Sequence, residues 1–120
     1  MDRIVDLAAT LEQAVADYAW DEEESFAYFL KDATRQMYAV LIIPVDKPQE
    51  SLPIVAAHLT KDQRVVIDTD LTDKPLYKAL MLAGVPREQM VLAYKGEPWP
   101  HLPQPPPFED DPTTPTNPDD

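Results

Sequence analysis

Apolar and polar residues alternate with two different periods along this chain, and the changes of period divide it into helices and strands. The pattern is clearest between residues 64 and 94. Residues 64–69 form a run rich in β-branched side chains, which is typical of a strand. Apolar positions then recur at helical spacing over residues 75–83, and residues 90–94 are apolar throughout. We therefore predict a strand, a helix and a second strand that is covered on both faces.

The residues that flank this helix support its boundaries. Thr72 or Asp73 can accept a hydrogen bond from the free N–H groups of the first turn, and Pro75 fits there because it lacks an N–H. Gly84 suits the left-handed position that follows a helix, and Pro86 prevents the helix from continuing. The helix is therefore expected to lie between these two groups of residues.

The first half of the chain predicts one helix and three strands. Residues 2–20 carry an apolar stripe at helical spacing, with Asp2 placed as an N-cap. Residues 25–30 suit a strand with Phe26, Tyr28 and Leu30 on one side, and residues 53–59 suit a strand with Val55, Ala57 and Leu59 on one face. Residues 36–43 are apolar enough for a central strand. Because only short connections join these strands to one another and to the next one, we expect an antiparallel arrangement.

In chain order these elements predict an α+β fold: an N-terminal helix, an antiparallel β-meander of about four strands, then a helix and a final strand in the same sheet. Residues 1–96 are expected to form this single domain. Residues 98–120 hold nine of the fourteen prolines, and residues 97–120 contain no Lys or Arg. This composition cannot bury enough apolar surface to become ordered, so residues 97–120 are predicted to be a disordered, Pro-rich acidic tail.

The composition also limits where the protein works. The chain has 120 residues and no cysteine, which excludes disulfides and is compatible with a reducing cytoplasm. No apolar run approaches the ~20 residues that a membrane helix needs. The first residues lack the basic start and apolar centre of a signal peptide. We therefore expect a cytoplasmic protein without membrane contact.

The charge of the chain restricts its partners. The net charge is −12, and residues 1–96 alone contain 10 basic and 16 acidic residues, a net charge of −6. Four of the acids are consecutive at residues 21–24, which we interpret as a solvated loop. Binding to DNA or RNA needs basic side chains that neutralise phosphates, so no direct nucleic-acid binding is expected. A negative field favours basic protein partners instead.

Residues that could carry chemistry are few. The only histidines are His58 and His101, and they form no metal-ligand spacing. Asp68, Asp70 and Asp73 faintly resemble a calcium loop, but the required glycine and final glutamate are missing, so helix capping explains them better. We expect no cofactor, no metal and no catalytic site. A small-ligand-binding or hydrolytic domain that uses Asp68, Asp70 and His58 is one alternative.

One block of the sequence indicates a family. Residues 84–94 read GVPREQMVLAY: a glycine, a proline, a basic and an acidic residue, then an apolar strand that ends in an aromatic. Together with Tyr38 and the Lys-Asp turn at residues 61–62, this block resembles the XisI family, the controlling factors of fdxN-element excision in cyanobacteria. The resemblance extends over residues 38–94. Gln63 departs from it, because the family usually has a turn glycine there.

The resemblance implies an α+β fold of this outline and an accessory role. Proteins of that family assist a site-specific recombinase in removing a DNA element, usually alongside a second small factor called XisH, which resembles nuclease folds. The resemblance carries over no catalytic residues. The C-terminal end that is usual in the family is replaced here by the Pro-rich tail, which marks this chain as a divergent branch.

We therefore expect a non-enzymatic regulatory protein that acts through a protein partner, either a XisH-like factor or a recombinase, and that can form an oligomer. The contact is predicted at Arg87, Glu88 and Tyr94, with Trp99 as a further anchor, because arginine and aromatic residues concentrate interface energy. An alternative is an acidic DNA mimic that occupies the basic groove of a nuclease or recombinase. The affinity of such a mimic would fall steeply with added salt.

Overall fold

A computed structural model describes residues 6–98 of the chain and confirms the predicted α+β fold. Its helices and strands follow the predicted order: α1 (Leu7–Ala16), β1 (Ser25–Asp32), β2 (Met37–Pro44), β3 (Leu52–Leu59), β4 (Val65–Asp70), α2 (Leu76–Leu82) and β5 (Met90–Leu92). Trp99 and the rest of the predicted tail lie outside the described residues. Neither helix within residues 6–98 has the length and apolar character that crossing a bilayer requires.

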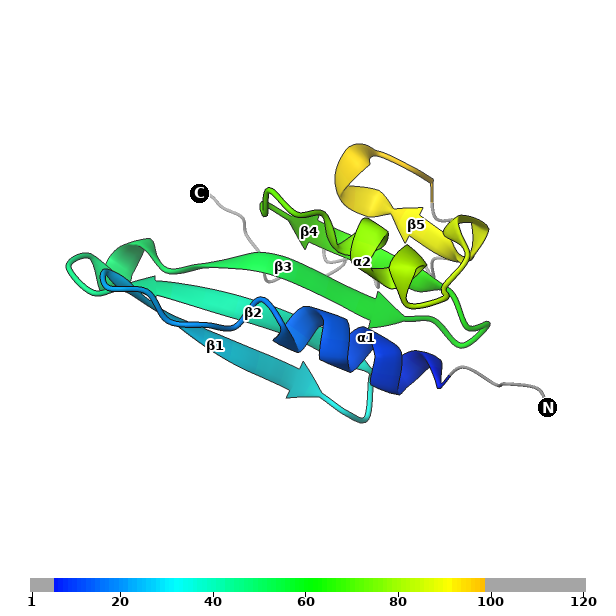
Figure 1. Cartoon of the computed structure of the whole chain (residues 1–120), viewed down its shortest axis with the longest axis horizontal. Helices are drawn as coiled ribbons and strands as arrows, with labels where there is room; N and C mark the ends of the chain where they lie inside the picture. Colours follow the sequence, from blue (N-terminus) through cyan, green and yellow to red (C-terminus); the bar gives the residue numbers. More distant parts are fainter. Residues whose placement is uncertain (1–5, 99–120) are drawn as a thin grey trace, which may run out of the picture.

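The strands form one sheet in the order in which they occur in the chain, β1-β2-β3-β4-β5 (Figure 1). The first four strands pair antiparallel, as the short connections predict. β5 pairs parallel to β4, with Val65 opposite Met90 and Ile67 opposite Leu92. This parallel pairing follows from the crossover through α2, which returns the chain to the same end of the sheet.

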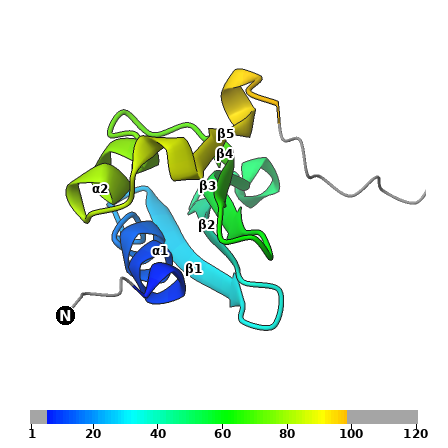
Figure 2. The ribbon, with the colours of Figure 1, turned by 90° about the vertical axis from the view of Figure 1, so that its right-hand side faces the viewer.

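Both helices lie on one face of the sheet (Figure 2). Leu11 and Val15 of α1 and Leu76 and Leu80 of α2 are fully buried against the inward-facing residues of the strands. The strand residues in this core alternate along each strand: Tyr38, Val40, Val55, Ala57, Leu59, Val65, Ile67, Met90 and Leu92. All three residues of β5 are buried, so the prediction of a covered last strand is confirmed.

In the edge strand β1 the side chains also alternate between the two faces, but large apolar residues lie on both of them. Ala27 and Phe29 face the helices, and the Phe29 ring stacks on Tyr38 with the ring centroids 6.4 Å apart. Phe26, Tyr28 and Leu30 lie on the opposite face and are about half exposed. The sequence correctly placed these three apolar residues on one side, and the structure shows that this side is not the one the helices cover.

The first helix is shorter than predicted. We expected residues 2–20, whereas α1 ends at Ala16 and begins after Asp6, whose side chain accepts a hydrogen bond from the Ala9 N–H at 3.1 Å. Asp2, the predicted N-cap, lies outside the described residues. The helix ends early because Tyr18 turns away and donates its hydroxyl to the Lys74 carbonyl in the β4–α2 linker. A tertiary contact therefore overrides the helical period.

The cap of α2 also differs from the prediction. Neither Thr72 nor Asp73 caps the helix: Asp70, at the end of β4, accepts the Leu76 N–H at 2.7 Å through one carboxylate oxygen. Its other oxygen accepts the Thr72 N–H at 3.0 Å and the Thr72 hydroxyl at 2.6 Å. One carboxylate therefore organises the whole linker between β4 and α2.

The last strand stops before the predicted end at Tyr94. β5 ends at Leu92, and a 3₁₀ turn, η3 (Ala93–Lys95), follows it. The Leu92 N–H bonds to the Glu97 carboxylate at 2.8 Å, and Gly96 adopts a left-handed φ of 88° that turns the chain back. Tyr94 therefore lies in a turn.

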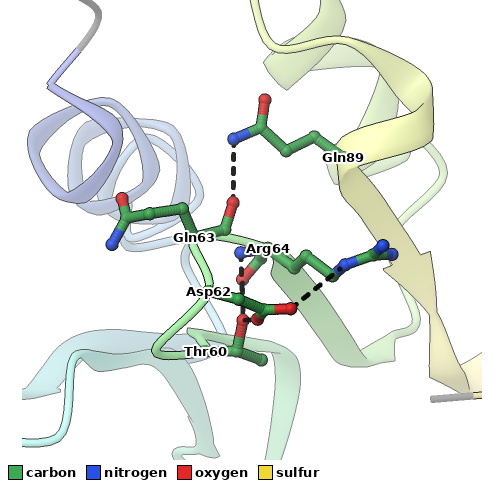
Figure 3. A network of polar contacts seen from close by, with 5 residues as sticks. All are labelled: Thr60, Asp62, Gln63, Arg64 and Gln89. Atoms are coloured by element: carbon green, nitrogen blue, oxygen red, sulfur yellow. Dashed lines mark hydrogen bonds and ion pairs between the residues drawn. The ribbon is translucent and has the colours of Figure 1, made fainter. Parts of the chain in front are cut away.

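The β3–β4 turn is held by a network of polar contacts (Figure 3). The Arg64 N–H donates to the Thr60 hydroxyl oxygen at 3.0 Å, while the Asp62 carboxylate contacts both the Thr60 hydroxyl and the Arg64 guanidinium. The Gln89 side chain donates to the Gln63 carbonyl at 2.8 Å. Gln63 itself has a left-handed φ of 66°, at the position where the resemblance called for glycine.

We expect Gln63→Gly to raise the free energy of unfolding by about 0.5–1 kcal/mol. Glycine adopts a positive φ without the cost that a Cβ imposes, and this gain exceeds the extra entropy of glycine in the unfolded chain. The hydrogen bond from Gln89 uses a backbone carbonyl and is retained. Urea denaturation measures the change. Lys61→Gly is the control, because Lys61 has no positive φ and should gain nothing; equal stabilisation of both variants would contradict the explanation.

Candidate functional site

The structure brings two of the predicted contact residues together around Tyr77. Arg87 lies in the 3₁₀ turn η2 (Arg87–Gln89), and its guanidinium carbon is 5.9 Å from the centroid of the Tyr77 ring. The Lys95 ammonium lies 5.6 Å from the same ring and 6.0 Å from the ring of Tyr94. These distances suit cation–π attraction. We call Tyr77, Arg87, Tyr94, Lys95 and Glu97 the Tyr77 cluster.

The predicted contact residues differ in how far they reach the surface. Glu88 is exposed on η2 beside Arg87. Trp99 lies outside the described residues. Tyr94 packs partly against the hydrophobic core, and burial raises the pKa of its phenol, with a further contribution from the carboxylate of Asp70. Of the four residues, Arg87 and Glu88 therefore offer charged groups at the surface, and Tyr94 offers one side of a half-buried ring.

Arg87 and Glu97 connect the turn after α2 to the end of β5. The Arg87 guanidinium donates to the Met90 carbonyl at 3.2 Å and pairs with one oxygen of Glu97. The other oxygen of Glu97 accepts the Leu92 N–H. The Leu92 hydrogen bond, and then the Arg87 pair, lower the pKa of Glu97. These contacts give Arg87 a structural role that the sequence did not reveal.

The lowered pKa of Glu97 predicts a pH-dependent contribution to stability. A carboxyl group whose pKa is lower in the folded state stabilises the fold above its unfolded pKa of about 4.5 and loses this effect as the pH falls through the folded pKa. Glu97→Gln should therefore be less stable than the parent at pH 7, and the difference should shrink below about pH 4. Urea denaturation at both pH values measures it; an equal difference at both would contradict the assignment.

A groove lies between the end of α1, the β4–α2 linker and α2. Its volume is about 1120 Å³. Three large apolar side chains that line it are strongly exposed: Trp20 at 62%, Leu71 at 63% and Leu82 at 91%. We call it the α1–α2 groove; its other lining residues are Ala14, Asp17, Tyr18, Glu22, Ile54, Thr72, Asp73, Lys74, Pro75, Lys78 and Ala79.

The charged residues of the α1–α2 groove have both signs. Lys74 and Lys78 contribute the positive charges, while Asp17, Glu22 and Asp73 contribute the negative ones. Exposed apolar side chains with charges of both signs around them are typical of a surface that contacts another protein. The sequence did not predict this groove. The only signal in the sequence was that large apolar side chains, Trp20 among them, stand next to acidic or linker residues.

The ligand-binding alternative used His58, Asp68 and Asp70, and the structure pairs the first two with each other. His58 Nδ1 lies 2.8 Å from Asp68 Oδ2, across a β-bulge at which the register of β3 against β4 shifts. Asp70 is engaged with α2 through the Leu76 N–H. None of the three lines the α1–α2 groove. Within residues 6–98, no three His, Asp or Glu side chains are grouped so that they could hold a metal ion. The structure therefore brings His58 and Asp68 together, whereas Asp70 is engaged at the start of α2.

Fold and surface together define a small α+β domain with a mixed five-stranded sheet, one helical layer and an apolar groove in that layer. A family model described as XisI protein matches residues 1–101, and the chain therefore belongs to the XisI family. A comparison with curated proteins gives no match.

Two solved structures share the fold. One is a XisI-like protein from Anabaena variabilis, 18% identical, with a TM-score of 0.62 over 75% of this chain and 85% of that one. The other is the fdxN element excision controlling factor XisI from Anabaena variabilis, 17% identical, with a TM-score of 0.56 over 72% of this chain and 88% of that one.

Proposed function

We propose that this protein is a non-enzymatic accessory factor that controls the site-specific excision of a DNA element by binding a protein partner. Membership of the XisI family supports the process, since a structural relative is described as an excision controlling factor. The net charge of −12 supports a protein partner over direct contact with DNA, because an acidic chain is repelled by phosphates. The expected partner is a XisH-like factor or a recombinase with a basic surface.

The exposed apolar lining of the α1–α2 groove is the observation that carries this proposal. Leu82, Leu71 and Trp20 leave most of their side-chain surface in water, although burying a leucine side chain is worth about 1.5–3 kcal/mol. Clustered exposed apolar side chains with polar surroundings mark interaction surfaces. A partner that inserts an apolar side chain between α1 and α2 would remove this surface from water.

The Tyr77 cluster borders the same helix and forms a second part of the proposed surface. α2 contributes Lys78, Ala79 and Leu82 to the α1–α2 groove and Tyr77 to the cluster. Glu88 is exposed next to Arg87 and can pair with a basic residue of the partner. α2 is therefore the element around which we expect the partner to bind.

Charge substitution in the groove tests this surface. Leu82→Asp should weaken binding of a XisH-like partner at least about tenfold, because it places a charge where an apolar contact forms. Val45→Asp is the matched control: Val45 is an exposed apolar residue outside the groove, and the charge change is the same. Titration calorimetry measures both affinities. Equal affinities for the two variants would exclude the groove as the contact.

A further inference from the structure

The edge strand β1 has an open side. It is the first strand of the sheet, and it pairs with β2 without a bulge from Ser25 opposite Pro44 to Asp32 opposite Met37. A regular edge strand presents unpaired N–H and C=O groups on its outer side, and proteins usually protect such edges with proline, bulges or covering segments. β1 contains neither proline nor bulge, so only Lys31 near its end and the segment that precedes it protect the edge.

That segment covers only the first half of the edge. The Ser25 N–H reaches the Glu22 carbonyl at 3.4 Å, and the Ala27 N–H donates to the Asp21 carboxylate at 3.0 Å. We call residues 21–24 the acidic hook. The contacts show that odd-numbered residues of β1 direct their backbone groups outward, while Glu24 directs its carbonyl toward Val45, on the β2 side.

By this alternation, the second half of the edge is open. Phe29 and Lys31 direct their N–H and C=O groups outward, and Ala27 directs its C=O outward. Within residues 6–98, no hydrogen-bond partner lies on that outer side of Phe29 and Lys31. The open groups are therefore centred on Phe29: the Ala27 C=O lies before it, and the N–H and C=O of Lys31 lie after it.

We propose that a second copy of this chain pairs with this edge, antiparallel, about a two-fold axis at Phe29. Phe29 then exchanges N–H···O=C bonds with Phe29 of the second copy, and the Lys31 N–H donates to the Ala27 carbonyl of the second copy. Two-fold symmetry repeats every bond, as in other isologous interfaces. At this pair the Lys31 carbonyl of the second copy faces the Ala27 N–H, so the Asp21 carboxylate, which accepts that N–H at 3.0 Å in the single chain, must move aside as the second copy binds.

Charge favours this antiparallel arrangement over a parallel one. The strand begins after the acidic hook and ends with Lys31 and Asp32, and Arg35 lies in the turn that follows. Antiparallel pairing places the acidic hook of each copy beside the Lys31 and Arg35 end of the other, whereas parallel pairing places like charges together. Arg35 contacts Asp32 through one nitrogen at 2.8 Å, and with its side chain 83% exposed it retains donors for a second carboxylate.

The outer face of the sheet supports the same register. Tyr28 and Leu30 are 50% and 48% exposed, and they alternate with Ala27 and Phe29, which pack on the helix side, so they lie on the other face of the sheet. About an axis at Phe29, Tyr28 lies opposite Leu30 of the second copy, in a pair without mutual backbone hydrogen bonds, where side chains approach most closely. Both apolar side chains lose exposed surface. Because β5 is at the other edge, the dimer keeps the Tyr77 cluster of both copies uncovered.

A proline substitution tests the proposal. Lys31→Pro removes the outward N–H from an edge strand, where proline is tolerated, and Lys31→Ala removes the same charge and the Glu12 ion pair but retains the N–H. Light scattering after size exclusion on the full chain should give a dimer for the parent and Lys31→Ala, and a dissociation constant at least about tenfold higher for Lys31→Pro. A monomeric parent, or equal dimerisation of both variants, would overturn the proposal.

Disulfide trapping tests the register independently of how Lys31→Pro folds. The chain contains no cysteine, so single cysteines report without background. Tyr28→Cys and Leu30→Cys, mixed and oxidised, should form the cross-linked heterodimer faster than either variant alone forms a homodimer, because the closest pair joins residue 28 of one copy to residue 30 of the other. Equal rates for the mixture and the separate variants would overturn the register.

Discussion

Leu80→Ala is expected to lower the free energy of unfolding by about 4 kcal/mol, within the range measured for buried leucines. The Leu80 side chain is fully buried between α2 and the sheet. Truncation removes its transfer free energy and leaves a cavity, and the two terms add because the surrounding strands cannot close the space. Urea denaturation followed by circular dichroism measures the loss.

Leu82→Ala is the matched control on the same helix. Leu82 is 91% exposed, so the same truncation should change the free energy of unfolding by less than about 0.5 kcal/mol. A similar loss for both variants would show that α2 does not bury the face described here. The pair also separates the buried face of α2, which Leu80 packs on the sheet, from its exposed face, where Leu82 belongs to the proposed partner surface.

Asp70→Ala should cost about 3 kcal/mol, nearly as much as a core truncation, although it removes a polar side chain. One carboxylate accepts the Leu76 N–H, the Thr72 N–H and the Thr72 hydroxyl. Alanine would leave the Leu76 and Thr72 N–H groups without this acceptor at the start of α2, and hydrogen bonds to a charged group are the stronger ones. Thermal unfolding measures the effect as a lower melting temperature.

Asp73→Ala distinguishes this cap from the one that the sequence predicted. Asp73 is exposed in the same linker, and its substitution should change stability by less than about 0.5 kcal/mol. If Asp73→Ala were the more destabilising of the two, the assignment of the cap to Asp70 would be wrong. The comparison holds net charge constant, because each variant removes one carboxylate.

The sequence predicted the strands, their order and the crossover through α2 because these depend on local periods and on short connections. It could not predict the ends of the elements with the same accuracy, since distant groups set them. Asp70 caps a helix that begins six positions later, and Tyr18 leaves α1 to reach the Lys74 carbonyl. No local period reports such contacts.

The candidate site was harder to predict for a related reason. The sequence selected Arg87 as a partner contact, whereas the structure engages it with Glu97, a residue assigned to the tail on composition alone. The apolar residues of the α1–α2 groove, Trp20, Leu71 and Leu82, come from three separate segments. Only the packing of α1 beside α2 brings them together, and no single segment contains the pattern.

The most direct test of the proposed function is co-expression with a XisH-like protein, followed by affinity purification at low and at high salt. We predict a complex that survives high salt, because apolar contacts in the α1–α2 groove are not screened by ions. A complex that is lost at high salt would indicate the acidic DNA mimic instead. Absence of a complex at both salt concentrations would contradict an accessory role through this partner.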